Sequence, residues 1–117
     1  MKLSLSVVVL LLAIGISSCH KEDPTFEYPF DAIVLGVNSD CGIYAIKILS
    51  GLPEVISIVG PTVGDSIYIA KNLPHSLEIE GAIISLDVRA PKAGELGLCT
   101  HMGPTYGWLF VVRAIGR

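Results

Sequence analysis

The hydrophobic and polar positions divide the chain into three parts. Residues 3–16 form an apolar run without a charged side chain, and residues 20–31 are rich in charge and proline. In residues 32–117, apolar segments alternate with glycine and proline turns. We therefore expect a leader at residues 1–18, a tether at residues 19–30 and one folded domain at residues 31–117.

Five segments of the domain have the pattern of β-strands. They are short, rich in β-branched residues and bounded by turn formers, and they cover residues 32–38, 43–49, 65–72, 82–90 and 108–115. The alternation is clearest in the fourth segment, where Ile84, Leu86 and Val88 share one face. Gly36 interrupts the first segment and indicates a bend or bulge.

Two segments between these strands are less regular. Residues 54–60 are predicted as a further short strand or a hairpin arm. Residues 72–81 are predicted to hold one or two helical turns, with Asn72 as a cap, Pro74 near the first turn and Gly81 as the stop.

The resulting order is strand, strand, strand, short helix, strand, long loop, strand. This is the order of a small five-stranded OB-like Greek-key barrel. The expected fold class is therefore all-β with one short helix, which lies between the third and fourth main strands. A β-sandwich is the alternative.

The apolar run at the start is too short to cross a membrane, because a spanning helix needs about 20 apolar residues. It fits the h-region of a secretory signal. Ile16, Ser17, Ser18 and Cys19 end it, and this pattern resembles the lipobox of bacterial lipoproteins. The resemblance implies cleavage before Cys19, a diacylglycerol on its thiol and an acyl chain, such as palmitate, on its new amino group. The alternative is a plain secreted protein with a cysteine at the cleavage site.

Several acyl chains on one residue would give stable membrane anchoring. Lys21, Glu22 and Asp23 follow Cys19 closely, and they resemble the lysine-plus-acidic export signal of Bacteroidota surface lipoproteins. We expect a lipid-anchored outer-membrane protein. Display on the cell surface and attachment at the periplasmic face are both open.

The net charge of the expected mature chain argues against one class of partner, nucleic acid. Cleavage before Cys19 would leave 99 residues with 7 basic and 11 acidic side chains, against 8 and 11 in the whole chain. The basic residues are scattered along the sequence. A small acidic domain of this kind is not expected to bind nucleic acid, which requires a positive surface.

The remaining cysteines predict a covalent link. With Cys19 assigned to lipid, Cys41 and Cys99 are left, and exported domains lie where disulfides form and persist. We expect a Cys41–Cys99 disulfide, with two thiols or a metal pair completed by histidines as alternatives. In an OB fold these cysteines would lie in the two loops on the ligand-binding side.

A longer resemblance covers most of residues 31–117. The run YIAKNLPHSLEIEGAIISLDVRAP at residues 68–91, together with Cys41-Gly42 and Cys99, resembles small Bacteroidota lipoproteins. These have a cysteine-glycine turn, an NLP segment before a short helix, and a second cysteine. The resemblance implies an OB-like domain and no particular chemistry.

Catalytic and metal-binding patterns do not stand out. The histidines are His20, His75 and His101, and the chain has no HExxH, GxSxG, P-loop or CxxC motif. We expect a non-enzymatic protein without a metal or a cofactor.

The candidate binding residues lie around the segment CTHMGPTYGW at residues 99–108. His101, Met102, Tyr106 and Trp108 concentrate ring and thioether surface there, which suits stacking on sugars or anchoring of a protein partner. Tyr44 and Tyr68 are expected to join them if their strands curl to that rim. The alternative is that Tyr106 and Trp108 plug one end of the barrel.

Two functions follow as hypotheses. The first is a lipid-anchored, non-catalytic binding module for a glycan or a peptide. The alternative is a structural or accessory subunit of an envelope protein assembly.

Overall fold

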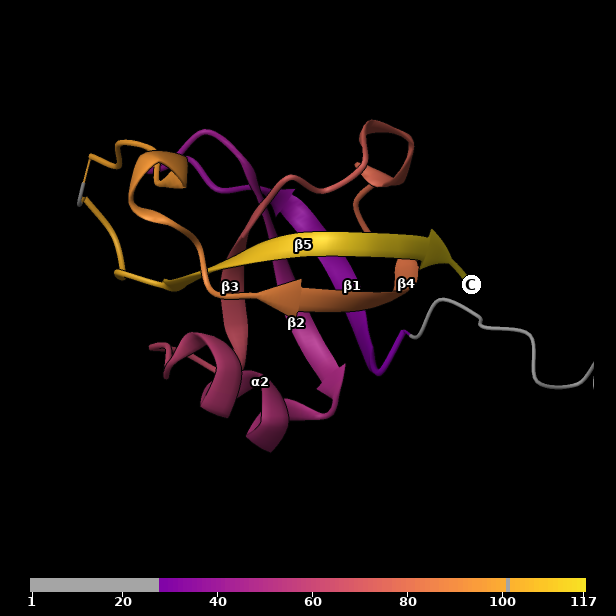
Figure 1. Cartoon of the computed structure of the whole chain (residues 1–117). Coiled ribbons are helices and arrows are strands. Elements are labelled where there is room, and N and C mark those ends of the chain that lie inside the picture. The colour runs from indigo at the N-terminus through magenta and orange to yellow at the C-terminus, as the bar shows by residue number, and fades with distance from the viewer. Residues whose placement is uncertain (1–27, 101) are drawn as a thin grey trace, which may run out of the picture.

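The computed structural model describes residues 28–100 and 102–117 (Figure 1). The expected leader, Cys19, the tether up to residue 27 and His101 lie outside these described residues. The strands are β1 (Phe30–Val37), β2 (Tyr44–Ser50), β3 (Ile67–Lys71), β4 (Ile83–Arg89) and β5 (Gly107–Gly116). The helix α2 covers Leu52–Val59, and short 3₁₀ turns cover His75–Leu77 and Ala93–Glu95.

The strands close into a barrel in the order β1-β2-β3-β5-β4. Neighbouring strands are antiparallel except β3 and β5, which run parallel. Closure removes open sheet edges, as in other small barrels. The predicted OB-like five-stranded barrel is confirmed, and the described residues do not form the alternative β-sandwich.

The interior of the barrel is filled by alternate residues of every strand. Ile84, Leu86 and Val88 of β4 are buried as their alternation predicts. They meet the inward side chains of the other strands, which include Val34, Ile46, Ile48, Tyr68, Ala70, Leu109 and Val111. Burial of each large aliphatic side chain stabilises the fold by about 1.5–3 kcal/mol.

The bend predicted at Gly36 is present. The pairing of β1 with β2 changes register between Val34 and Val37, the stretch that contains Gly36. Such an irregularity increases the local twist of a strand. It helps β1 to bend while it pairs with β2 on one side and with β4 on the other.

The prediction of a strand at residues 54–60 is wrong, because α2 occupies this segment. Leu52, Val55 and Val59 pack against the barrel core, and their spacing of three and four residues follows the helical period. Pro53 stands in the first turn, where its missing N–H has no intrahelical partner to lose. A short apolar run fits the two-residue period of a strand as well as the 3.6-residue period of a helix. The pattern of residues 54–60 alone therefore led to the wrong assignment.

Gly51 sets the entry into α2. Its φ is 85°, in the left-handed region that favours glycine. A Cβ at this position would also collide with the ring of Phe30. Of the described residues, none belongs to a helix long and apolar enough to cross a membrane.

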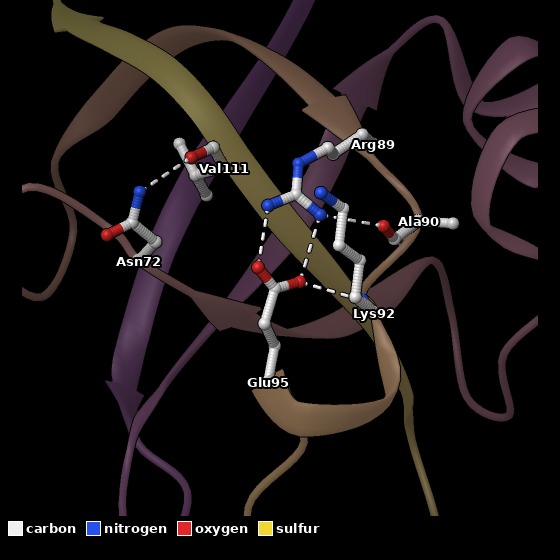
Figure 2. Close-up of polar contacts among 6 residues, drawn as sticks. All are labelled: Asn72, Arg89, Ala90, Lys92, Glu95 and Val111. Atoms are coloured by element: carbon white, nitrogen blue, oxygen red, sulfur yellow. Dashed lines mark hydrogen bonds and ion pairs between the residues drawn. The ribbon is translucent and has the colours of Figure 1, made fainter.

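The helical turn predicted within residues 72–81 is present as the 3₁₀ turn His75–Leu77, between β3 and β4. The α-helix α2, between β2 and β3, is an element that the sequence pattern did not predict. Asn72 does not cap the 3₁₀ turn, whose preceding residue is Pro74. Instead, Asn72 adopts a φ of 68°, and its Nδ2 donates to the carbonyl of Val111 at 3.1 Å (Figure 2). Its side chain thereby links the end of β3 to β5.

The beginning of β1 and the C-terminus meet at one end of the barrel. Asp31 accepts a hydrogen bond from Ser85 Oγ at 2.8 Å and forms an ion pair with Arg117 at 3.0 Å. The hydrogen bond from Ser85, with those from Ser50 and Arg117, lowers the pKa of Asp31. The loops that carry Cys41 and Cys99 lie on the opposite side of the molecule (Figure 1).

Candidate functional site

Two loops meet at the end of the barrel away from the C-terminus. The β1–β2 loop comprises residues 38–43, and the β4–β5 loop comprises residues 90–106. The predicted disulfide joins them: Cys41 and Cys99 are bonded with an S–S distance of 2.06 Å and lie 58 positions apart. Both loops are thereby held on the same side of the barrel, as the OB-like topology requires.

Asp40 adds a second connection between the loops. Its carboxylate accepts hydrogen bonds from the hydroxyl of Thr100 at 2.8 Å and from the backbone N–H of Gly103 at 2.7 Å. The backbone N–H of Thr100 also donates to the Asp40 carbonyl at 2.9 Å. Hydrogen bonds to an ionised acceptor are stronger than neutral ones. The tip of the β4–β5 loop is therefore held at Cys99 by the disulfide and, beyond it, at Thr100 and Gly103 by Asp40.

Asn38 positions Asp40 for this role. The Asn38 side-chain oxygen accepts hydrogen bonds from the backbone N–H groups of Asp40 at 3.0 Å and Cys41 at 2.9 Å. This is the local turn that asparagine favours when its side chain binds the backbone that follows. Sequence reasoning placed a turn here but missed both Asn38 and Asp40. The available signal was the turn-forming pattern, which does not indicate a partner 60 positions away.

The start of the β4–β5 loop is fixed by a salt bridge. Arg89, the last residue of β4, donates from both terminal nitrogens to the Glu95 carboxylate at 2.9 and 2.7 Å (Figure 2). Glu95 also accepts from the backbone N–H of Lys92 at 2.7 Å. The bonds from Arg89 and Lys92 lower the pKa of Glu95 to about 2, and Glu95 raises the pKa of Arg89. The Arg89 guanidinium also lies 3.7 Å from the centre of the Phe110 ring.

A pocket of about 190 Å³ lies between the two loops. The disulfide, Asp40, Leu96, Leu98, Pro104, Thr105, Tyr106 and Trp108 contribute to its lining. Most of this lining is apolar. It is smaller than the cavities of roughly 300–1,000 Å³ that hold drug-sized ligands, so it suits one ring or one side chain.

Trp108 forms part of the pocket from the outer face of β5. Its neighbour Leu109 points into the barrel core and is completely buried, whereas Trp108 is only half-buried. Successive residues of a strand point to opposite faces. The Trp108 ring packs under the β4–β5 loop, where a Cβ on Gly97 would lie 3.1 Å from its Cη2 atom.

Tyr106 is supported by the loop that precedes β3. Its ring approaches Gly64, where a Cβ would lie 3.0 Å from Cε1. The hydroxyl of Thr62 accepts from the N–H of Gly107 at 2.7 Å and donates to the carbonyl of Ile67 at 2.7 Å. These contacts fix the backbone between Tyr106 and Trp108. Neither ring belongs to the barrel core cluster.

The other predicted binding residues have different positions. Met102 is highly exposed on the β4–β5 loop, and Tyr44 is half-buried and packs against the core. Tyr68 is completely buried, and its hydroxyl donates to the carbonyl of Gly60 at 2.7 Å. Burial raises the Tyr68 pKa. Tyr68 is therefore a core residue, and its expected place on the binding rim is corrected.

Metal-binding groups do not assemble in the part of the chain that the structure describes. No cluster of three or more His, Cys, Asp or Glu side chains there has the arrangement to hold a metal ion. His75 is exposed on its 3₁₀ turn and contacts Glu78.

Comparison of the chain with protein-family models, with curated proteins and with solved structures finds no match in any of the three. The site is therefore interpreted from its own residues and geometry.

Proposed function

We propose that this protein is a lipid-anchored cell-envelope protein that acts as a non-catalytic binding module. Its binding site is the pocket between the β1–β2 and β4–β5 loops, and its ligand is a glycan or a peptide. The observation that carries the proposal is an apolar pocket with two aromatic rings, held by a disulfide and by Asp40. Such pre-ordering reduces the entropy lost on binding.

The placement of this pocket fits a tethered protein. Strand β1 contains eight residues, from Phe30 near the tether to Val37 before the β1–β2 loop. At about 3.3 Å per residue, its ends lie on the order of 25 Å apart. A lipid on Cys19 would attach at the Phe30 end. The pocket would then face away from the membrane and be accessible to a ligand.

The lipobox residues Ile16 to Cys19 support the anchor. Nine residues, 19–27, separate the lipid attachment from the described domain, and they can extend over at most roughly 30 Å. The domain would thus stay close to the membrane surface. We propose the outer membrane as its location, with Lys21, Glu22 and Asp23 as the export signal in the case of surface display.

The anchor is tested by replacing Cys19 with serine. Wild-type protein should fractionate with membranes and incorporate labelled palmitate, whereas C19S should do neither. A Cys41→Ser/Cys99→Ser variant is the matched control, because it replaces the other two cysteines but keeps Cys19. Equal membrane association of wild type and C19S would refute the lipid anchor. Protease treatment of intact and lysed cells then distinguishes the surface from the periplasmic face.

An accessory role in an envelope assembly is the second candidate. It is favoured by Ile83 and Ile115, which are exposed on the neighbouring strands β4 and β5. Exposed aliphatic side chains on adjacent strands suit a protein contact. Mild crosslinking in cells, followed by purification, should then recover a partner with wild type and much less with Ile115→Ser. Equal recovery with both proteins would argue against this contact.

A further inference from the structure

The polar groups of the pocket restrict the class of ligand. Asp40 is the only side chain among the described lining residues that carries a charge at neutral pH. Both its carboxylate oxygens already accept hydrogen bonds from the β4–β5 loop. The one charged side chain of the described lining therefore already serves to hold the β4–β5 loop. Thr105, Tyr106 and Trp108 each contribute one further polar side-chain group to the lining.

This small number of polar groups disfavours the binding of a sugar. A sugar ring carries a hydroxyl on most of its carbons, and each hydroxyl removed from water needs a new hydrogen-bond partner. Leu96, Leu98 and Pro104 occupy much of the lining and offer no side-chain partner. An uncharged apolar group has no hydrogen bonds to water to replace, and its burial against the same residues is favourable.

The β4–β5 loop, which forms much of the pocket, also carries exposed apolar side chains. Leu98 is 95% exposed and Met102 is 86% exposed, the highest values among the large apolar residues of the described chain. Both lie within three positions of Cys99, which the disulfide joins to the β1–β2 loop. Apolar side chains held in water near a pocket are typical of protein contact sites, where an anchor residue is surrounded by a rim that excludes water.

We propose that the pocket binds a protein partner by accepting one uncharged apolar side chain, with Leu98 and Met102 covering the partner backbone on either side. The size of the pocket fits a single large side chain. The described lining is mostly apolar and its one charged side chain, Asp40, holds the loop, which favours an uncharged side chain of the partner over a charged one. This inference rests on the proposed function, because it names the ligand class of the same pocket.

Trp108 provides the assay, because it is the only tryptophan of the chain and contributes to the pocket wall. The full processed protein in lipid nanodiscs is titrated with blocked glycine-serine pentapeptides that differ in the central residue. Methyl glycosides and linear oligosaccharides form the second set of probes. Calorimetry on the same samples detects binding that leaves the fluorescence unchanged.

Two leucines give a matched pair of variants. Leu96 lines the pocket and is 54% exposed, and Leu49 at the end of β2 is 52% exposed and lies outside it. Peptides with central leucine, methionine or phenylalanine should bind saturably, and those with serine, aspartate or lysine should not. Leu96→Ser should weaken binding by about tenfold, because it removes apolar contact from the pocket wall that receives the anchor. Leu49→Ser should bind as wild type does.

The outcomes separate this inference from the proposed function. Saturable binding of saccharides without binding of apolar peptides would overturn the inference and leave the binding module standing. Peptide binding that Leu96→Ser does not weaken would also overturn it, since the peptide would lie elsewhere. No binding of either class by fluorescence or calorimetry would overturn both proposals.

Discussion

Asp40 and Thr100 are joined by two hydrogen bonds across 60 positions of the chain. The Thr100 hydroxyl donates to the Asp40 carboxylate at 2.8 Å, and its backbone N–H donates to the Asp40 carbonyl at 2.9 Å. The Cys41–Cys99 disulfide joins the residues immediately beside them. This arrangement links the two pocket loops both covalently and through polar contacts. The stability of the pocket therefore depends on both connections.

Replacing Asp40 with alanine should loosen the tip of the β4–β5 loop. The change removes the acceptors for Thr100 Oγ1 and for the N–H of Gly103, and we expect a loss of about 1–3 kcal/mol. Urea unfolding measures this loss. Asp65→Ala is the control, because Asp65 is exposed and forms an ion pair with Lys47 at 3.5 Å. Such surface pairs contribute little. Equal unfolding midpoints for D40A and wild type would contradict the assigned role.

Removing the disulfide should have a larger effect on stability. The Cys41→Ala/Cys99→Ala variant loses a link that spans 58 positions, and the chain-entropy model gives a loss of about 4 kcal/mol. Denaturant unfolding with and without a reducing agent is the measurement. Wild type should become as unstable as the double variant under reducing conditions, while the variant should not respond. A reducing agent that leaves wild type unchanged would argue against a structural role for the bond.

Although Trp108 and Leu109 are neighbours on β5, Leu109 should contribute mainly to stability and Trp108 mainly to ligand binding. Leu109→Ala leaves a cavity in the barrel core and should cost about 2–5 kcal/mol. Trp108 is half-buried outside the core cluster, so Trp108→Ala should lower the melting temperature less and abolish ligand binding. Circular dichroism melting and calorimetric titration measure the two effects. Global unfolding of W108A would show that the ring is primarily structural.

The Arg89–Glu95 pair should make the stability of the fold depend on pH. The pKa of Glu95 is lowered from 4.5 to about 2 in the folded state, so its stabilising contribution is complete above its unfolded pKa. That contribution should decline as the pH falls below about 4.5 and be lost near pH 2. The stability difference between wild type and Glu95→Gln should shrink over this interval. NMR titration of the Glu95 carboxyl gives the direct check, and a midpoint near 4.5 would contradict the salt bridge.

Much of the barrel could be predicted because its strands have local signals. Ile84, Leu86 and Val88 alternate with polar residues, and one face of β4 is buried accordingly. The disulfide could be predicted because only two cysteines remained after Cys19 was assigned to lipid. Tyr68 shows the limit of this approach: Ile67, Tyr68, Ile69 and Ala70 are all apolar, so the sequence did not indicate which side faces the interior.

The helix α2, the role of Asp40 and the pocket could not be predicted, because they depend on contacts that leave no local pattern in the sequence. Val55 and Val59 lie on the buried side of α2, but eight residues between two glycines fit a short strand equally well. The role of Asp40 follows from Thr100 and Gly103, which approach it only when the barrel closes. Trp108 and Tyr106 were identified by composition alone. Their shared pocket also depends on Thr62 and Gly64 from the loop before β3 and on Gly97 from the β4–β5 loop itself.

The most direct test of the central claim combines flotation with a measurement of Trp108 depth. The claim is that a lipid anchor holds the domain at a membrane with its pocket facing away. The processed protein is mixed with liposomes, floated in a density gradient and exposed to nitroxide-labelled lipids or to aqueous iodide. We expect it to float, with Trp108 fluorescence quenched by iodide but not by the labelled lipids. Failure to float, or quenching by the labelled lipids, would contradict the claim.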